Sequence, residues 1–233
     1  MPERRLPLLL LPGLLCDQRL WRDQARDLGD VAETSIPDLT LDDSLSAMAR
    51  RVLDAAPERF ALAALSMGGY VAFEILRQQP ERVTRLALVD TSAALDSPQR
   101  VTQRLAGIKS LKHGRFFGVT TRMLPQLVHA KHVHGPIGAE VQAMAKRVGG
   151  DAFLRQQNAI LHRPDSRPLL TSINVPTLVA VGDSDILTPP SDAEDMHRQI
   201  AGSIYYVFAA CGHLPPMEVP EETTQVLRRW LLE

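Results

Sequence analysis

The stretch 60–76 constrains the fold of this chain more than any other. A short apolar run leads to Ser66, two glycines follow, and helical apolar spacing begins at once. A strand that turns this sharply into a helix needs small neighbours, because the two backbones nearly touch there. Ala64, Gly68 and Gly69 supply them. The pattern therefore predicts a strand, a tight turn and a helix, with the Ser66 hydroxyl pointing away from the sheet.

The same turn makes Ser66 a candidate nucleophile. The N–H of Met67 is expected in the first turn of the helix, where the helix dipole favours negative charge. A serine beside such a donor suits chemistry in which negative charge develops nearby. A buried serine with a purely structural role is the alternative that the motif alone leaves open.

The composition is that of an ordinary globular chain. Its 233 residues, 45% hydrophobic and 23% charged, suffice for one large α/β domain or two small ones with a real core. The net charge of −1 argues against general affinity for nucleic acid or membranes. Cys16 and Cys211 are too few and too far apart for a disulfide scaffold or a zinc ribbon. We therefore expect reduced thiols and a cytoplasmic location.

The first residues imitate a secretory signal, with Arg4 and Arg5 ahead of an apolar run. The residue before Cys16 is a bulky leucine, however, and Pro7 and Pro12 interrupt the run. We therefore expect no cleaved signal, and no other stretch approaches the length of a membrane span.

Strands and helices alternate along most of the chain. The strand candidates are near-continuous apolar runs, which is typical of parallel strands covered on both faces. This alternation predicts a doubly wound, mostly parallel α/β sheet of about six strands with right-handed crossovers. The predicted strands are 6–11, 31–36, 60–65, 85–90, 177–181 and 204–208. The predicted helices are 19–28, 44–55, 67–79, 190–200 and 221–232.

One stretch, 91–168, breaks the alternation. It holds helical segments punctuated by proline and glycine but no convincing strand, and it is too long for a loop in a compact domain. We expect an inserted helical cap there, on a core formed by residues 1–90 and 169–233. Twelve basic and four acidic side chains give the stretch a net charge of +8, whereas the whole chain carries −1. This asymmetry can steer an anionic substrate or an acidic partner to a cleft, and a merely solvated basic surface is the alternative.

A serine nucleophile needs a histidine to take its proton and an acid to orient that histidine. Both follow Ser66 in the chain, each just after a predicted strand. Asp185 follows the strand 177–181, and His213 follows the strand 204–208. Because the carboxyl ends of parallel strands share one edge of the sheet, the order Ser…Asp…His predicts a catalytic triad at that edge.

With these motifs the chain resembles the α/β-hydrolase superfamily over nearly its whole length. The loop 182–189, which reads Gly-x-x-Asp-x-x-x-Pro, is similar to the family's acid loop, and this favours Asp185. The Gly-His pair that ends at His213 is similar to the family's histidine loop. Asp90 also ends a strand, and some members of the superfamily take their acid from that place. Asp183 is a third candidate acid, and the alternative interpretation of this residue is that it braces the loop.

The segment 10–15, followed by Trp21, resembles the family's oxyanion segment and the aromatic residue that trails it. The resemblance implies that the backbone N–H groups of Leu14 and Met67 form the oxyanion hole. Two such donors lower the barrier by roughly 3–4 kcal/mol each. Pro12 stands where the family usually has histidine, but a backbone donor does not depend on that side chain.

Other residues near the site have competing interpretations. Three close histidines suggest a metal, but they lack carboxylate or thiolate company, and we expect no metal and no cofactor. The two cysteines are expected to line the site as small apolar groups. Four apolar residues of the 91–168 stretch either line an acyl pocket or pack inside the cap. The histidines are His129, His132 and His134, and the apolar residues are Phe116, Phe117, Met123 and Met144.

The resemblance implies a serine hydrolase that cleaves a carboxylic ester, lactone or thioester through an acyl-enzyme. Among relatives, the stretch 45–94 is most similar to small carboxylesterases such as pimeloyl-carrier-protein methyl esterase. That group implies a substrate carried on an acidic protein, which suits a basic cap. The same triad also serves C–C bond hydrolysis, cofactor-free haloperoxidase or lyase chemistry, and some members of the superfamily are small-molecule receptors with little turnover.

Overall fold

A computed structural model describes residues 5–112, 114 and 116–233. Arg4 and Arg115, which entered the arguments above, lie outside the described residues. Six parallel strands form one sheet in the order β2-β1-β3-β4-β5-β6. The strands are β1 (Leu6–Leu11), β2 (Ala32–Ser35), β3 (Phe60–Leu65), β4 (Val83–Val89), β5 (Thr177–Gly182) and β6 (Ile204–Phe208). The predicted parallel α/β sheet is confirmed.

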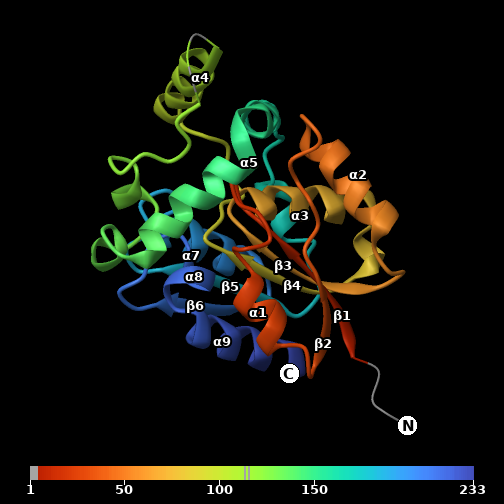
Figure 1. Ribbon diagram of the computed structural model, residues 1–233. Helices are drawn as coiled ribbons and strands as arrows, with labels where there is room; N and C mark the ends of the chain where they lie inside the picture. The colour runs from red at the N-terminus through yellow and green to blue at the C-terminus, as the bar shows by residue number, and fades with distance from the viewer. Residues whose placement is uncertain (1–4, 113, 115) are drawn as a thin grey trace.

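Helices cover both faces of this sheet (Figure 1). One apolar cluster joins one face of the strands to α2, α3 and α7, and a second cluster joins the opposite face to α1 and α9. The helices are α1 (Arg22–Asp27), α2 (Leu45–Ala55), α3 (Met67–Gln78), α7 (Pro190–Gln199) and α9 (Pro220–Leu232). Three short elements complete this part of the chain, η1 (Pro80–Arg82), α6 (Arg167–Leu170) and α8 (Pro215–Glu218).

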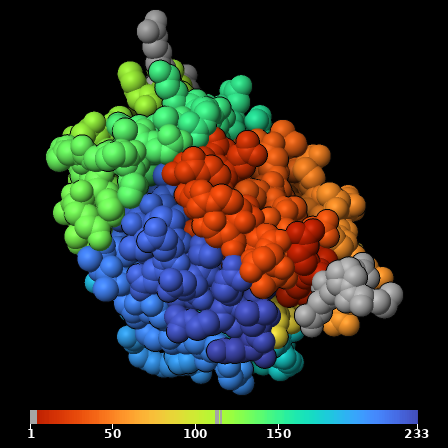
Figure 2. Space-filling model, turned by 60° about the horizontal axis from the view of Figure 1, so that its bottom comes forward, coloured from red at the N-terminus to blue at the C-terminus, as the bar shows by residue number. Residues whose placement is uncertain are grey.

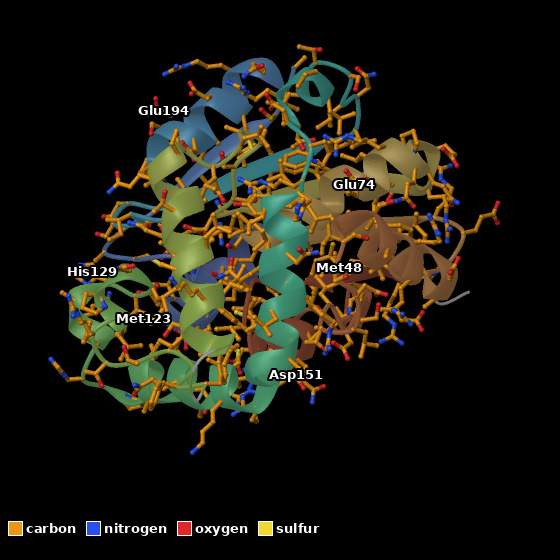
Figure 3. The ribbon with its side chains drawn as sticks, turned by 90° about the horizontal axis from the view of Figure 1, so that it is seen from above. Met48, Glu74, Met123, His129, Asp151 and Glu194 are labelled. Atoms are coloured by element: carbon orange, nitrogen blue, oxygen red, sulfur yellow. The ribbon has the colours of Figure 1, made fainter. Side chains whose placement is uncertain are left out.

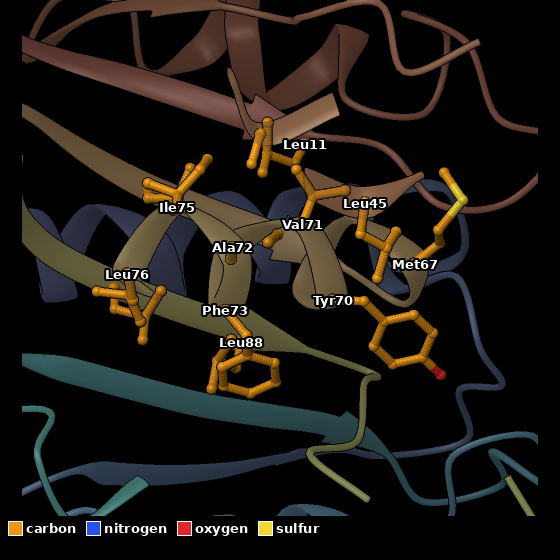
Figure 4. Close-up of a cluster of buried hydrophobic side chains, with 14 of the residues drawn as sticks. Leu11, Leu45, Met67, Tyr70, Val71, Ala72, Phe73, Ile75, Leu76 and Leu88 are labelled. Carbon is orange, nitrogen blue, oxygen red and sulfur yellow. The ribbon is translucent and has the colours of Figure 1, made fainter. Parts of the chain in front are cut away.

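The centre of the molecule is the pair β3 and α3. All six residues of β3 are buried, as are ten consecutive residues of α3, so the helix packs deeply against the sheet (Figure 4). A Cβ on Gly68 would lie 2.5 Å from the carbonyl oxygen of Leu11, and one on Gly69 would collide with Thr91. Glycine is therefore required at both positions, because neighbouring groups leave no room for a Cβ. The Thr91 hydroxyl lies close enough to donate a hydrogen bond to the Ser66 carbonyl at 2.7 Å.

The segment between β4 and β5 contains no strand among its described residues, as predicted. Its main helices are α4 (Pro98–Lys112) and α5 (Pro136–Leu161), which lie side by side in the view from above (Figure 3). Two short 3₁₀ helices, η2 (Leu124–Gln126) and η3 (Ala130–His132), connect them. In the space-filling view, residues of this segment lie across one end of the molecule, above the N-terminal and C-terminal parts (Figure 2). The apolar side chains of α5 join both core clusters.

Helix α5 changes direction in the middle. Gly149 has φ 84° and ψ 173°, which lies outside the helical region and is accessible mainly to glycine. The next residue, Gly150, faces the ring of Phe116 at a distance that leaves little room for a side chain. The first half of α5 packs into one apolar cluster through Val141, Met144 and Ala145, and the second half packs into the other through Ala159 and Ile160. No helix in the described part of the chain is long and apolar enough to span a membrane.

Candidate active site

Strained backbone conformations cluster at the carboxyl edge of the sheet. Among the described residues, the non-glycine residues with positive φ are Leu15, Ser66, Asp90 and Ala210, and each closely follows the end of a strand. Ser66 has φ 54° and ψ −117°, directly between β3 and α3. Non-glycine residues in such conformations cost about 1–3 kcal/mol each and cluster at functional sites. This strained turn is the one that the sequence predicts.

Three predicted site residues meet at this edge. Nε2 of His213 lies 2.9 Å from the Ser66 hydroxyl oxygen, and Nδ1 of His213 lies 2.7 Å from Oδ2 of Asp185. Because an ionised carboxylate only accepts hydrogen bonds, Nδ1 carries the hydrogen and Nε2 is left to accept the hydroxyl proton. His213 and Asp185 are both buried. The arrangement can activate a serine oxygen.

Asp185 is held as a carboxylate by its surroundings. Oδ1 accepts from the N–H groups of Leu187 and Thr188 at 2.8 and 3.3 Å, and Oδ2 accepts from the Thr188 hydroxyl at 2.7 Å. Burial alone would raise the pKa of Asp185. The charge and hydrogen bond of His213, together with the Thr188 hydroxyl, outweigh burial and lower the pKa. Sequence reasoning missed Thr188, although it precedes the proline of the acid loop.

The alternative acid, Asp90, lies beside the triad but does not hydrogen-bond to His213. Its Oδ1 accepts from the Gly182 N–H at 2.9 Å, and its Oδ2 is buried with no donor facing it in the described part of the chain. One oxygen of Asp90, one of Asp185 and a ring nitrogen of His213 lie within 4.8 Å of one another. Burial and the neighbouring Asp185 charge raise the pKa of Asp90. A proton on Asp90 would give its unpaired oxygen a hydrogen bond to Asp185.

The third acid candidate, Asp183, points away from the histidine. Its carboxylate accepts from the N–H groups of Ala210 and Cys211 at 2.8 and 3.1 Å and from the Ser184 hydroxyl at 2.8 Å. These bonds lower the pKa of Asp183 despite its partial desolvation. Asp183 therefore ties the acid loop to the loop before His213, which is the bracing alternative considered for it.

A buried glutamate that sequence reasoning missed holds the histidine loop. Glu218, in α8, accepts from the N–H groups of Gly212 and Leu214, which flank His213, at 3.0–3.1 Å. It also accepts from the N–H of His129 at 2.7 Å. The carboxylate thus fixes the backbone on both sides of His213. The available signal was an acidic residue five positions after the histidine, beside two prolines that start a short helix.

The predicted oxyanion donors, Leu14 and Met67, line the same cavity as Ser66. The neighbouring N–H of Leu15 is already used, donating to Oε1 of Gln156 at 3.1 Å. Leu15 is therefore not the free donor of this loop, and Leu14 stays the predicted one. Trp21 supports the loop from behind, because its indole N–H donates to the Leu11 carbonyl at 3.0 Å.

A cavity of about 250 Å³ opens beside Ser66. Of the four apolar candidates from the segment 91–168, Met123 and Met144 line it. Phe117 does not, because it is 77% exposed, and Phe116 instead packs against the ring of Phe153 at 5.8 Å between centroids. Further lining residues from this segment are Val119, Val141, Phe153 and Ile160 on the apolar side and Arg100, Gln103, Arg104 and Gln157 on the polar side.

Of the two cysteines expected to line the site, Cys16 lines the cavity and Cys211 does not, and the three histidines lie outside the lining. Burial raises the pKa of the Cys16 thiol to about 12 and raises that of Cys211 as well, so neither is a thiolate at neutral pH. His129 accepts from the Lys131 N–H through Nδ1. Nε2 of His132 is buried without a partner in the described part of the chain, and burial lowers the pKa of this ring.

Comparison with known proteins agrees with this geometry. Residues 40–220 match the sequence profile of the family described as alpha/beta hydrolase fold. The chain belongs to this α/β-hydrolase family. It is 29% identical over 156 residues to a pimeloyl-[acyl-carrier protein] methyl ester esterase from Neisseria meningitidis, covering 64% of this chain and 60% of that protein. A protein of the same description from Vibrio campbellii is 27% identical over 237 residues, covering 90% of this chain and 88% of the relative.

Solved structures give the same family. A thermophilic esterase from Thermogutta terrifontis, solved with malate bound, is 31% identical with a TM-score of 0.86, covering 97% of this chain and 89% of the esterase. An enol-lactonase from Burkholderia xenovorans shares the fold at 21% identity with a TM-score of 0.82, covering 99% of this chain and 93% of the lactonase. The family and the fold expected from the sequence are confirmed.

Proposed function

We propose that this α/β-hydrolase is a serine carboxylesterase for esters of small to medium carboxylic acids, with lactones and thioesters as related substrates. One observation carries the proposal. Ser66, His213 and Asp185 form a hydrogen-bonded chain beside a largely apolar cavity, with 2.9 and 2.7 Å between successive groups. A serine oxygen activated in this way attacks acyl carbon atoms.

In the acylation step, the Ser66 oxygen forms a bond to the ester carbonyl carbon while its proton passes to Nε2 of His213. The carbonyl oxygen becomes negative and receives hydrogen bonds from the N–H groups of Leu14 and Met67. Asp185 stabilises the imidazolium that forms. Collapse of the tetrahedral intermediate breaks the bond to the leaving oxygen or sulfur, which takes the proton from Nε2 and departs as an alcohol or thiol.

Water completes the reaction. His213 takes a proton from a water molecule, whose oxygen attacks the acyl carbon of the acyl-enzyme. The second tetrahedral intermediate uses the same two backbone donors, and its collapse returns the proton to the Ser66 oxygen. The products are a carboxylic acid and the regenerated serine, so electrons and protons balance within the chain and one water molecule.

The division into a core (1–90 and 169–233) and a cap (91–168) is part of the proposal. It is supported by the position of α4 and α5, whose residues supply much of the cavity wall. We also propose that the substrate is either a small anionic acyl ester or an acyl group carried on an acidic protein. The relatives named for a pimeloyl group on acyl-carrier protein support this, as do the exposed basic side chains of Arg122, Lys131 and Lys146 on the segment 91–168.

The test is intact-protein mass after treatment with a fluorophosphonate, which phosphonylates an activated serine. We expect a single adduct on the wild type, none on Ser66→Ala, and an unchanged adduct on the control Ser172→Ala, whose serine is exposed and remote from the cavity lining. Turnover of a short-chain ester should fall about a million-fold in Ser66→Ala. An adduct that persists on Ser66→Ala, or a folded wild type that forms none, would refute the proposal.

A further inference from the structure

Positive charge gathers at the α4 end of the cavity. The carboxylate of Asp96 lies among three guanidinium groups, those of Arg100, Arg104 and Arg163. Two of them donate hydrogen bonds to the carboxylate. Arg104 Nε donates to Oδ2 at 2.5 Å, and Arg163 Nη2 donates to Oδ1 at 3.0 Å. Burial would raise the pKa of Asp96, but these two bonds hold it at about 2. This acid is therefore ionised and fully occupied.

Arg100 is the third guanidinium group of this cluster, and it makes no hydrogen bond to Asp96. It lines the cavity, and its Nε is 3.8 Å from Oδ1 of Asp96, which is beyond hydrogen-bond distance. No hydrogen bond joins its guanidinium to a protein group in the described part of the chain. Arg104 also lines the cavity, but its nitrogens are committed to Asp96 and to Oε1 of Gln157. Arg100 is therefore the cation with donors to spare.

The charges facing Arg100 leave this corner positive. The charge of Arg100 also acts on the carboxyl of Asp192, in α7, which is half-buried and close to Ser92. Burial raises the pKa of Asp192 above its usual value. Even with both acids ionised, three guanidinium groups face two carboxylates. An anion can therefore be received beside Arg100 without displacing a protein carboxylate.

The cavity that Ser66 and Arg100 both line has a mostly apolar wall. Val119, Val141, Met144, Phe153 and Ile160 belong to that wall and offer a bound chain no hydrogen bonds from their side chains. A ligand that fits such a cavity has a reactive carbonyl at one end, an apolar middle and a negatively charged group at the other end. In a site of low dielectric, the attraction between that group and Arg100 is stronger than it would be in water.

We propose that Arg100, assisted by the side-chain amide of Gln103, binds a free carboxylate at the far end of the acyl group, so that the preferred substrates are half-esters of dicarboxylic acids. The proposal rests on the esterase function proposed above. The planar guanidinium presents paired N–H donors that match the two oxygens of a carboxylate. Hydrolysis then consumes the half-ester and water and releases a dicarboxylic acid and an alcohol, with no further reactant.

The experiment compares methyl half-esters of dicarboxylic acids of increasing chain length with methyl esters of monocarboxylic acids of equal length, followed by proton release. For the best chain length, the wild type should prefer the charged ester. In Arg100→Gln, kcat/KM for the charged ester should fall about 10- to 100-fold, as expected for a hydrogen bond to a charged group, while the neutral ester changes little. Arg100→Lys keeps the positive charge but not the paired N–H donors of the guanidinium. Its kcat/KM for the charged ester should therefore fall less than that of Arg100→Gln.

Arg50→Gln is the matched control, because it removes the same charge from an exposed residue of α2 that does not line the cavity. It should leave the ratio of charged to neutral ester unchanged. A wild type without charge preference, or equal losses on both esters in Arg100→Gln, would overturn the inference. A preference for the same chain ending in phosphate over carboxylate would overturn the assigned substrate class. Failure of the esterase function itself is distinguishable, because then neutral esters are not hydrolysed and Ser66 forms no phosphonate adduct.

Discussion

The loops at the carboxyl edge of the sheet and the segment 91–168 contribute different things to the site. The loops carry the groups proposed to react, Ser66, Asp185 and His213. The segment carries none of these groups, yet it contacts the loop that positions the histidine, since the His213 N–H donates to the Leu127 carbonyl at 3.1 Å. The difference suggests that chemistry depends on strand ends, whereas positioning and substrate choice depend on the inserted helices.

One side chain joins the two regions. Gln156, in the second half of α5, is fully buried and uses both ends of its amide. Its Oε1 accepts from the Leu15 N–H at 3.1 Å, and its Nε2 donates to the Leu39 carbonyl at 3.1 Å. Leu15 itself has φ 58°, so an unfavourable backbone conformation next to the proposed oxyanion donor Leu14 is held by a residue of the inserted segment.

The largest expected effect separates the two acids at the sheet edge. Asp185→Asn should lower kcat about ten-thousand-fold, because an amide facing Nδ1 of His213 favours the wrong tautomer. Asp90→Asn should change kcat only a few-fold, because Asp185 and not Asp90 is hydrogen-bonded to His213, and an amide can donate to Asp185 as a protonated carboxyl would. Steady-state kinetics on a short-chain ester measures both. The reverse order of effects would transfer the role of the acid to Asp90.

The next effect tests whether the inserted segment reaches the chemistry. Gln156→Met keeps the approximate shape of the side chain but removes both hydrogen bonds. We expect kcat to fall up to about 100-fold with KM little changed, because a displaced oxyanion loop weakens binding of the transition state more than that of the ester. Affinity for a boronic acid that mimics the tetrahedral intermediate should fall in parallel.

Two controls make this a test of position rather than of stability. Gln156→Glu keeps an acceptor for the Leu15 N–H and should recover part of the lost kcat. Gln199→Met makes the same substitution on α7, where the glutamine amide donates to the Asp195 carbonyl of its own helix, and it should leave kcat unchanged. A positioning role would be contradicted if KM rose in Gln156→Met by the same factor by which kcat fell, while the affinity for the boronic acid did not change.

The sheet and the acid and histidine loops could be predicted because they depend on local patterns. The strands 6–11, 60–65 and 204–208 were predicted with their observed bounds, since each is an apolar run bounded by polar or turn residues. The strand predicted at 85–90 begins two residues earlier and ends at Val89. Asp90 belongs instead to the strained turn, with φ 43°. Parallel strands then bring Ser66, Asp185 and His213 to one edge, whatever their separation in sequence.

The supporting contacts could not be predicted, because they join residues far apart in the chain. Nothing in the local sequence around Gln156 indicates that its amide reaches Leu15, and the same holds for Glu218 and the His129 N–H. The apolar residues Phe116 and Phe117 illustrate the limit, since composition alone does not say which side of a helical segment faces a cavity. Long-range side-chain pairs are decided by tertiary packing, which the sequence pattern does not specify.

The smallest expected effect concerns the stability of the sheet edge itself. The pKa of Asp90 is raised in the folded protein above its usual value of 3.8. Below pH 3.8 Asp90 is protonated in both the folded and the unfolded chain, and its contribution to the free energy of unfolding is fully present. As the pH rises from 3.8 toward the folded pKa, Asp90 ionises in the unfolded chain but not in the folded one, and this contribution is lost. Asparagine cannot ionise, so the urea midpoint of Asp90→Asn relative to the wild type should increase from pH 4 to pH 8. A difference that stays constant, or that decreases with pH, would mean that the pKa of Asp90 is not raised in the fold.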